Sequence, residues 1–227
     1  MNYLFDLEPP SLPVQGTDAH FPINRVFCVG RNYEDHALEM GADPAREPPF
    51  FFSKPASAVF VPHMHVPYPP RTDDLHYEVE LVVALGAGGR GLTPAQARDA
   101  VFGYGVGVDL TRRDLQRDAK QHGRPWDVAK GFDASGPISP LIRRETSGWL
   151  QQGRIALSVN GELRQQGNLV KMIWAVDEII AELSTYYTLQ PGDLIFTGTP
   201  AGVGPVVPGD AIEAGIEGVG RLSFRIV

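Results

Sequence analysis

The chain has 227 residues, which is long enough for one large domain with its own core and short for two. Its 43% hydrophobic and 21% charged residues are typical of a soluble globular protein, and a net charge of -7 without a Lys/Arg-rich block argues against nucleic acid as a partner. The single cysteine excludes an internal disulfide. No apolar stretch suits a membrane span or a signal-peptide core, so we expect a cytoplasmic protein with no membrane partner.

The first half of the chain is predicted to form short strands separated by Pro- and Gly-rich turns. Residues 1–22 are predicted to be a short apolar strand followed by a Pro-rich N-terminal arm, and an amphipathic segment over 33–40 ends at Gly41. The remaining strand candidates in this half are 25–29, 50–52, 58–61 and, most clearly, 76–85.

The second half adds helices to further strands. Thr93 as N-cap, with Pro94 in the first turn, predicts a helix start. The strand 104–108 is followed by a polar helix predicted over 110–121. Asn160-Gly161 favours a type I′ hairpin turn, because both residues tolerate positive φ.

The last long element is an amphipathic helix predicted over 169–187, before strands at 194–197 and 222–227. The apolar residues that fall at helical spacing in it are Met172, Ile173, Val176, Ile179, Ile180 and Leu183. Many short strands and few helices indicate one β-rich α+β domain over 1–227.

Two carboxylates lie two positions apart in the clearest strand. Residues two apart share a strand face, so Glu78 and Glu80 project together while Val79 and Leu81 pack on the other side. Without a cation, one of two adjacent carboxylates tends to take up a proton. The pattern alone fits a divalent-metal site and the solvated face of an edge strand about equally.

A third carboxylate, Asp109, follows a strand in which glycine alternates with larger residues. The glycines have the same strand parity as Asp109, so that face is bare backbone, which permits close approach of another backbone or of a ligand. Three carboxylates together form an all-oxygen site, which favours Mg²⁺ or Mn²⁺ over Zn²⁺.

Several motifs occur along the chain in a fixed order. They are Cys28-Val29-Gly30-Arg31-Asn32-Tyr33 with His36 and Glu39; Ser53-Lys54-Pro55; 76–81; Asp109-Leu110-Thr111 with Arg113 and Gln116; 130–133; Asn160-Gly161; and 191–205. In this order they resemble the fumarylacetoacetate hydrolase family over nearly the whole chain. The stretch 21–52 resembles bacterial fumarylpyruvate hydrolases and related acylpyruvate hydrolases.

The resemblance implies a mixed β-sandwich roll of the C-terminal-domain type found in that family, and a homodimer. It also implies that Glu78, Glu80 and Asp109 bind Mg²⁺ or Mn²⁺. The substrate would be a small dicarboxylic keto acid.

His36 and Glu39 are three residues apart, so they share a face of a helical turn. Glu39 can orient the imidazole, and His36 can then take a proton from water. We expect the pair on a lid over 31–42 that closes over the metal. An exposed helix histidine is the alternative for His36.

The other candidates would act on a negatively charged substrate. Lys130 would stabilise the negative charge of an enolate, unless it is a solvated loop lysine. Arg113 and Gln116, three apart and just after Asp109, would hold a carboxylate. The neighbouring charges, expected to be solvated, are Arg112, Asp114 and Arg117.

Further substrate contacts are expected from the strand end at 197–199 and from the 30–32 segment. Backbone N–H groups around Gly198 and the Thr199 hydroxyl could hold a substrate carboxylate, although an ordinary strand-to-loop turn is the alternative. Arg31 completes the expected substrate-binding set.

The resemblance favours hydrolysis of a carbon–carbon bond in an acylpyruvate, with fumarylpyruvate, which would yield fumarate and pyruvate, as the specific candidate. Decarboxylation of oxaloacetate or isomerisation of a hydroxymuconate-type diacid would use the same metal–enolate chemistry. A non-catalytic metal or keto-acid binding protein would predict a damaged triad or a missing His36–Glu39 pair. Both are intact in the sequence.

Overall fold

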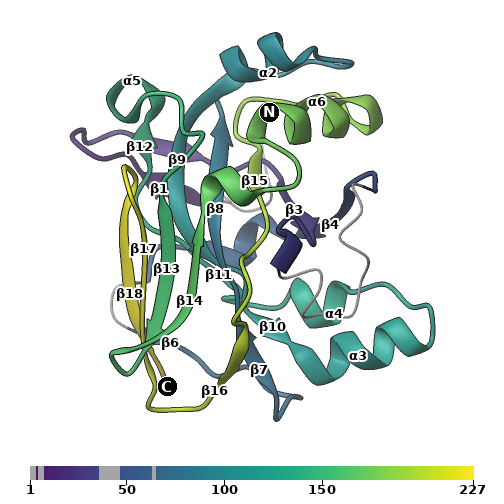
Figure 1. Ribbon diagram of the computed structural model, residues 1–227, viewed down its shortest axis with the longest axis vertical. Coiled ribbons are helices and arrows are strands. Elements are labelled where there is room, and N and C mark those ends of the chain that lie inside the picture. Colours follow the sequence, from purple (N-terminus) through teal and green to yellow (C-terminus); the bar gives the residue numbers. More distant parts are fainter. Residues whose placement is uncertain (1–3, 5–7, 36–46, 63–64) are drawn as a thin grey trace.

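The computed structural model describes residues 4, 8–35, 47–62 and 65–227, and two mixed β-sheets form its centre (Figure 1). The larger sheet has six strands in the order β12-β9-β8-β15-β3-β4. Its strands are β3 (Val26–Gly30), β4 (Phe50–Lys54), β8 (Val79–Leu85), β9 (Val101–Val108), β12 (Ile142–Arg143) and β15 (Leu194–Phe196).

The second sheet has five strands in the order β14-β13-β17-β18-β6. Its strands are β6 (His65–Val66), β13 (Arg154–Val159), β14 (Glu162–Asn168), β17 (Ala211–Ile216) and β18 (Gly220–Ile226). Asn160 and Gly161 join β13 to β14 with φ of 51° and 79°, so the predicted hairpin turn is confirmed.

Smaller pairings complete the strands. A three-stranded sheet has the order β10-β7-β16, and β1 pairs with β2, as β5 does with β11. These strands are β1 (Ser11–Pro13), β2 (His20–Pro22), β5 (Val59–Phe60), β7 (Leu75–Tyr77), β10 (Thr111–Arg112), β11 (Gly136–Pro137) and β16 (Gly204–Val206).

The helices lie at the ends and sides of the sheets: α2 and α6 are at the top of Figure 1, and α3 and α4 at the lower right. They are α2 (Pro94–Ala100), α3 (Arg113–Gln121), α4 (Asp127–Lys130), α5 (Arg144–Ser147) and α6 (Val176–Tyr186), with short 3₁₀ turns η1 (Ala56–Ala58) and η2 (Leu169–Lys171). Among the described residues, no helix has the length and apolar character needed to cross a membrane. The N-cap predicted at Thr93 is confirmed, and the Gln96 side chain completes a capping box with it.

The six-stranded sheet is covered on both faces, so every residue of β8 is buried, and all of them except Glu80 are apolar. On one face, Leu81 and Val83 join the core that the five-stranded sheet and α6 cover. On the other face, Val82 packs in a second core with Leu12 and Phe21 of the N-terminal arm. The predicted β-rich α+β fold is confirmed, and the arm, which contains the β1–β2 hairpin, serves to cover this second face.

The glycine face of β9 is also confirmed as a place of close approach. A Cβ on Gly103 would lie 2.2 Å from the Ile142 carbonyl oxygen, and one on Gly107 would lie 2.7 Å from the Phe196 ring. Backbone and side chains of the protein, and not a ligand, therefore occupy this face.

Two predicted helices begin later than expected. The helix predicted over 110–121 begins at Arg113, because Thr111 and Arg112 pair with β7 instead. The helix predicted over 169–187 begins at Val176, because the backbone N–H groups of Ile173 and Trp174 donate to Asn32. The apolar spacing of Met172 and Ile173 therefore did not indicate a helix at those two positions.

Candidate metal centre

Three adjacent strands of the six-stranded sheet break at one level and continue as the three-stranded sheet. The order β9-β8-β15 on one side of the break becomes β10-β7-β16 on the other. The breaks fall at Glu78, at Asp109–Leu110 and at 197–203. The Asp109 N–H donates to the Glu78 carbonyl at 2.8 Å, so the break after β9 lies directly beside the break between β7 and β8. The strand predicted over 76–85 is thus two strands.

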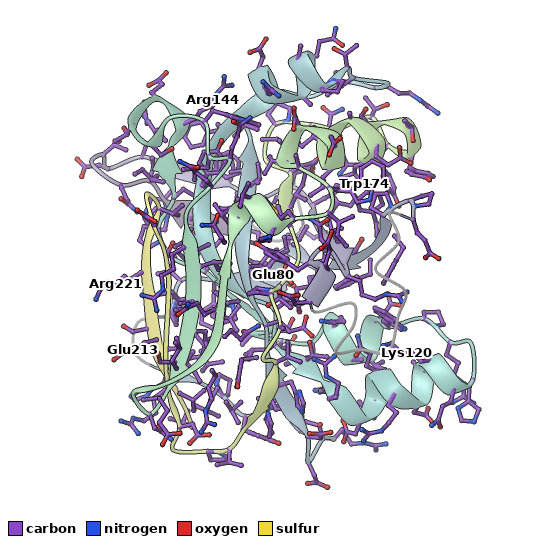
Figure 2. The ribbon with its side chains drawn as sticks, in the orientation of Figure 1. Glu80, Lys120, Arg144, Trp174, Glu213 and Arg221 are labelled. Carbon is purple, nitrogen blue, oxygen red and sulfur yellow. The ribbon has the colours of Figure 1, made fainter. Side chains whose placement is uncertain are left out.

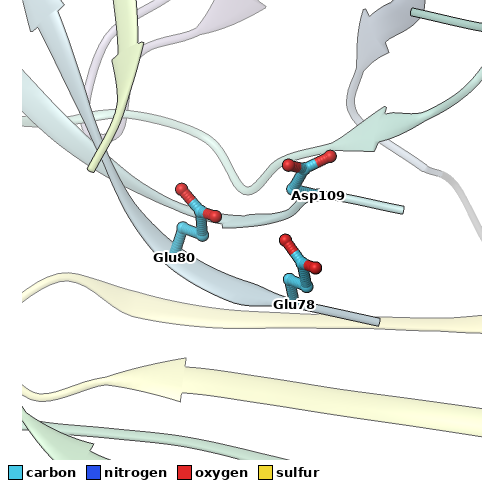
Figure 3. Close-up of side chains that lie close together, drawn as sticks. All are labelled: Glu78, Glu80 and Asp109. Carbon is cyan, nitrogen blue, oxygen red and sulfur yellow. The ribbon is translucent and has the colours of Figure 1, made fainter. Parts of the chain in front are cut away.

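The carboxylates of Glu78, Glu80 and Asp109 converge at this break (Figure 3). One oxygen from each lies within 4.8 Å of the other two. Glu78 and Glu80 are 5% and 2% exposed, and β8 has a neighbour on each side. The solvated edge-strand interpretation of this pair is therefore wrong.

Lys130, the last residue of α4, contacts two of the three carboxylates. Its ammonium donates to Glu78 Oε2 at 2.8 Å and to Asp109 Oδ2 at 2.7 Å. A third bond, of 2.6 Å, goes to Thr111 Oγ1. Lys130 is 2% exposed, so it is not a solvated loop lysine. Burial by itself lowers the pKa of Lys130, but the negative charges of Asp109 and Glu78 together outweigh it, so the pKa is raised.

Two further cations complete the surroundings. Lys54 Nζ lies 2.8 Å from Asp109 Oδ1, in an ion pair whose angles fall outside hydrogen-bond geometry. Arg113, the first residue of α3, donates to Glu78 Oε1 at 2.5 Å. Each of the buried carboxylates of Glu78 and Asp109 therefore contacts two cations.

Glu80 has no ion pair among the residues that the structure describes; its Oε2 accepts the Gly198 N–H at 2.7 Å. Burial, followed by the negative charges of Asp109 and Glu78, raises the pKa of Glu80 well above its usual value. A bound cation would remove this conflict. A buried all-oxygen donor set fits a hard divalent cation such as Mg²⁺ or Mn²⁺, which would be held by these three carboxylates.

Glu78 and Glu80 line a cleft that is partly open to solvent, and Asp109 lies buried beside them. Besides Glu78 and Glu80, its polar lining consists of cations and hydrogen-bonding side chains, and aromatic rings form most of its apolar wall. The main lining residues are Arg31, Phe50, Arg113, Gln116, Lys120, Trp126, Lys130 and Thr199. The cleft therefore suits an anionic ligand.

The model of the family described as fumarylacetoacetate (FAA) hydrolase C-terminal matches residues 25–227. The chain belongs to the fumarylacetoacetate hydrolase family. The family resemblance inferred from the motifs is thus confirmed.

Solved and curated members of the family are similar to this chain over most or all of its length. The crystal structure of fumarylpyruvate hydrolase from Pseudomonas aeruginosa in complex with Mn²⁺ and pyruvate is 49% identical, covers 100% of this chain and 99% of that one, and has a TM-score of 0.97. A fumarylpyruvate hydrolase of Ralstonia sp. is 46% identical over 81% of this chain and 95% of its own length. An oxaloacetate tautomerase of Escherichia coli is 42% identical over 90% and 93%, respectively.

The structure brings most of the predicted family site residues to one cleft. Arg113 and Gln116 are joined by a 2.6 Å hydrogen bond and line the cleft with Arg31. Thr199 lines it too, but its hydroxyl donates to the Val79 carbonyl and accepts from Gln165. His36, Glu39 and the lid residues 36–42 lie outside the described residues.

Two of the neighbouring charges are not solvated as predicted. Arg112 is half-buried, with its guanidinium 4.4 Å from the Phe132 ring centroid, and donates to the Val128 carbonyl. Asp114 is half-buried and accepts from the Thr72 hydroxyl at 2.6 Å. Arg117 is exposed, as predicted.

Sequence reasoning missed two buried residues that position the site. Lys54 was noted only as part of a motif, although its ammonium also donates to Ser135 Oγ at 3.0 Å and to the Lys130 carbonyl. Asn32 donates to the Thr197 carbonyl at 2.8 Å, which ties the loop after β3 to the end of β15. No local pattern indicates either role, because both depend on partners more than 50 residues away.

Proposed function

We propose that this chain hydrolyses a carbon–carbon bond of an acylpyruvate with the help of Mg²⁺ or Mn²⁺, and that fumarylpyruvate is the substrate. The observation that carries the proposal is the buried carboxylate triad, of which Glu78 and Glu80 line a cleft whose charged wall is otherwise cationic. Similarity to two fumarylpyruvate hydrolases, one solved with Mn²⁺ and pyruvate, supports it.

The charges around the triad favour an anionic substrate once a cation is bound. Three carboxylates face the three cations Lys54, Arg113 and Lys130, so their formal charges sum to zero. A divalent cation would raise this sum to +2. A 2-oxo acid that develops an enolate carries two negative charges, one on its carboxylate and one on its enolate oxygen. These two charges balance that sum.

A metal held by the triad would act as a Lewis acid on the oxygens of the 2-oxo acid end of the substrate. Water must add to the acyl carbonyl while its proton goes to a base, for which we propose His36, oriented by Glu39. The bond between the acyl carbon and the methylene then breaks, and its electron pair leaves on the pyruvate part as an enolate. Protonation of the methylene carbon gives pyruvate, and the acyl carbon leaves as a carboxylate.

We propose that Lys130 stabilises the enolate. Lys130 lines the cleft, and its ammonium already contacts carboxylates of two triad residues. We propose Arg31, Arg113, Gln116 and Thr199 as substrate contacts, because all four line the same cleft. Gly198 donates to Glu80, so we propose that it positions this metal ligand.

The relatives also support a second candidate, tautomerisation of oxaloacetate, because an oxaloacetate tautomerase of Escherichia coli is 42% identical. That reaction interconverts the enol and keto forms by moving a proton between oxygen and carbon, and it needs no activated water. A panel of fumarylpyruvate, acetylpyruvate, oxaloacetate and a hydroxymuconate, each assayed with Mg²⁺ and Mn²⁺, separates the two. We expect fumarylpyruvate cleavage to have the highest kcat/KM. If oxaloacetate were the only substrate of the panel that is turned over, the hydrolase proposal would be rejected.

Replacing His36 with alanine is expected to lower hydrolysis about 10²- to 10⁴-fold, because the base that activates water is lost. Metal binding should not change, since His36 is not one of the three carboxylates. His122→Ala, which removes an exposed histidine at the end of α3, is the matched control. Stopped-flow loss of the diketo absorbance measures hydrolysis, and calorimetric titration with Mn²⁺ measures metal binding. Wild-type hydrolysis in His36→Ala would show that another group activates water.

A further inference from the structure

The outer wall of the cleft carries two cations that rest on aromatic rings. The Arg31 guanidinium lies 5.2 Å from the Phe50 ring centroid, and Lys120 Nζ lies 5.3 Å from that of Trp126. The two rings pack edge to face with centroids 5.3 Å apart. All four residues line the same cleft as Glu78 and Glu80. Figure 2 shows Lys120 on α3, to the side of the central Glu80.

The local backbone is built to hold this arrangement. A Cβ on Gly30 would lie 2.0 Å from Phe50 Cζ, so only glycine lets the ring rest against the chain there. Arg31 follows with a positive φ of 56°, which is uncommon for a residue with a side chain. Together they place the Arg31 guanidinium at the mouth of the cleft.

Neither outer cation has a carboxylate partner in the part of the chain that the structure describes, whereas Arg113 and Lys130 both contact Glu78. The pKa of Lys120 is lowered by partial burial, and then by the positive charges of Arg113 and Arg31, which outweigh Glu78. Positive charge therefore exceeds negative charge at this end of the cleft. An anion bound there would reduce the repulsion.

We infer that Lys120, together with Arg31, determines specificity by binding a second carboxylate at the far end of the acyl group. This inference rests on the proposed function, in which the triad end of the cleft receives the 2-oxo acid. The planar, conjugated chain of a fumaryl group suits a wall of Phe50 and Trp126, because flat π-systems pack well on aromatic rings. An acyl group that ends in a methyl would offer neither cation a partner.

The kinetic test compares two substrates that differ at the far end, fumarylpyruvate and acetylpyruvate. In Lys120→Met, kcat/KM for fumarylpyruvate should fall about tenfold, as expected for one charged hydrogen bond at a partly exposed site. The value for acetylpyruvate should stay within about twofold. Lys120→Arg should keep most of the wild-type preference, since it keeps the charge. Arg117→Met, which removes an exposed cation from the same helix, is the matched control.

A binding measurement tests the same residue without turnover. Fumarate and crotonate share a planar four-carbon skeleton, but crotonate has a methyl in place of the second carboxylate. Calorimetric titration of the Mn²⁺-loaded protein should show that fumarate binds more tightly, and that Lys120→Met removes most of the difference. If Lys120→Met lowered the affinity for fumarate and crotonate equally, or lowered neither affinity, the role of Lys120 would be overturned.

The two measurements also separate this inference from the proposed function. If wild-type protein cleaves neither acylpyruvate, the hydrolase proposal fails, and the fumarate–crotonate comparison still tests Lys120. If wild-type protein cleaves fumarylpyruvate and Lys120→Met keeps its preference over acetylpyruvate, the function stands and the specificity role is rejected.

Discussion

Replacing Glu80 with glutamine is expected to abolish divalent-metal binding and turnover together. Glu80 supplies one of three converging carboxylates, and glutamine keeps its size while removing its charge. Loss of a direct ligand should weaken Mn²⁺ affinity by more than about a hundredfold, since even residues behind the ligands are worth 10- to 100-fold. Calorimetric titration with Mn²⁺ measures the affinity, and the substrate panel measures turnover.

The same variant should leave the metal-free fold intact. Glu80 has no ion pair among the described residues, and the nearby negative charges of Asp109 and Glu78 oppose its ionisation. A neutral side chain removes that repulsion, so the unfolding midpoint without metal should stay equal or rise. Glu213→Gln, an exposed change on β17, is the control. Wild-type Mn²⁺ affinity in Glu80→Gln would refute the metal site.

Replacing Lys130 with methionine is expected to destabilise the metal-free protein and to remove turnover. The change leaves buried oxygens of Glu78 and Asp109 without their ammonium partner. Removing one member of a buried ion pair typically costs 3–5 kcal/mol, so the free energy of unfolding should fall by about that amount. Added Mn²⁺ should raise the unfolding midpoint more in this variant than in wild type, because the metal supplies the missing positive charge.

Turnover is the measurement that separates a chemical role of Lys130 from a structural one. If Lys130 stabilises the enolate, kcat should stay about 10²- to 10³-fold low even when Mn²⁺ has restored stability. Lys171→Met, which removes an exposed lysine in η2, should change neither the stability nor kcat. Recovery of both stability and kcat on metal addition would mean that Lys130 is only a counter-ion.

The strands and turns were predictable because their signals are local. The alternation in β8 placed Glu80 opposite Leu81, and Asn160-Gly161 gave the hairpin its turn. Helix starts were less predictable: apolar spacing continues through Ile173, but hydrogen bonds to Asn32 hold that segment out of the helix. These partners are more than 100 residues apart, so no sequence window contains both.

The sequence by itself was enough to identify the family, the fold class and which three carboxylates would converge. The order of the motifs and the alternation of residues along a strand can both be read directly from the sequence. Only the tertiary structure decided which charges meet. The coincident breaks in β8, β9 and β15 bring Glu78 beside Asp109, and only folding surrounds them with Lys54 and Lys130. Electrostatic interactions depend on distance and burial in space, and neither follows from spacing along a chain.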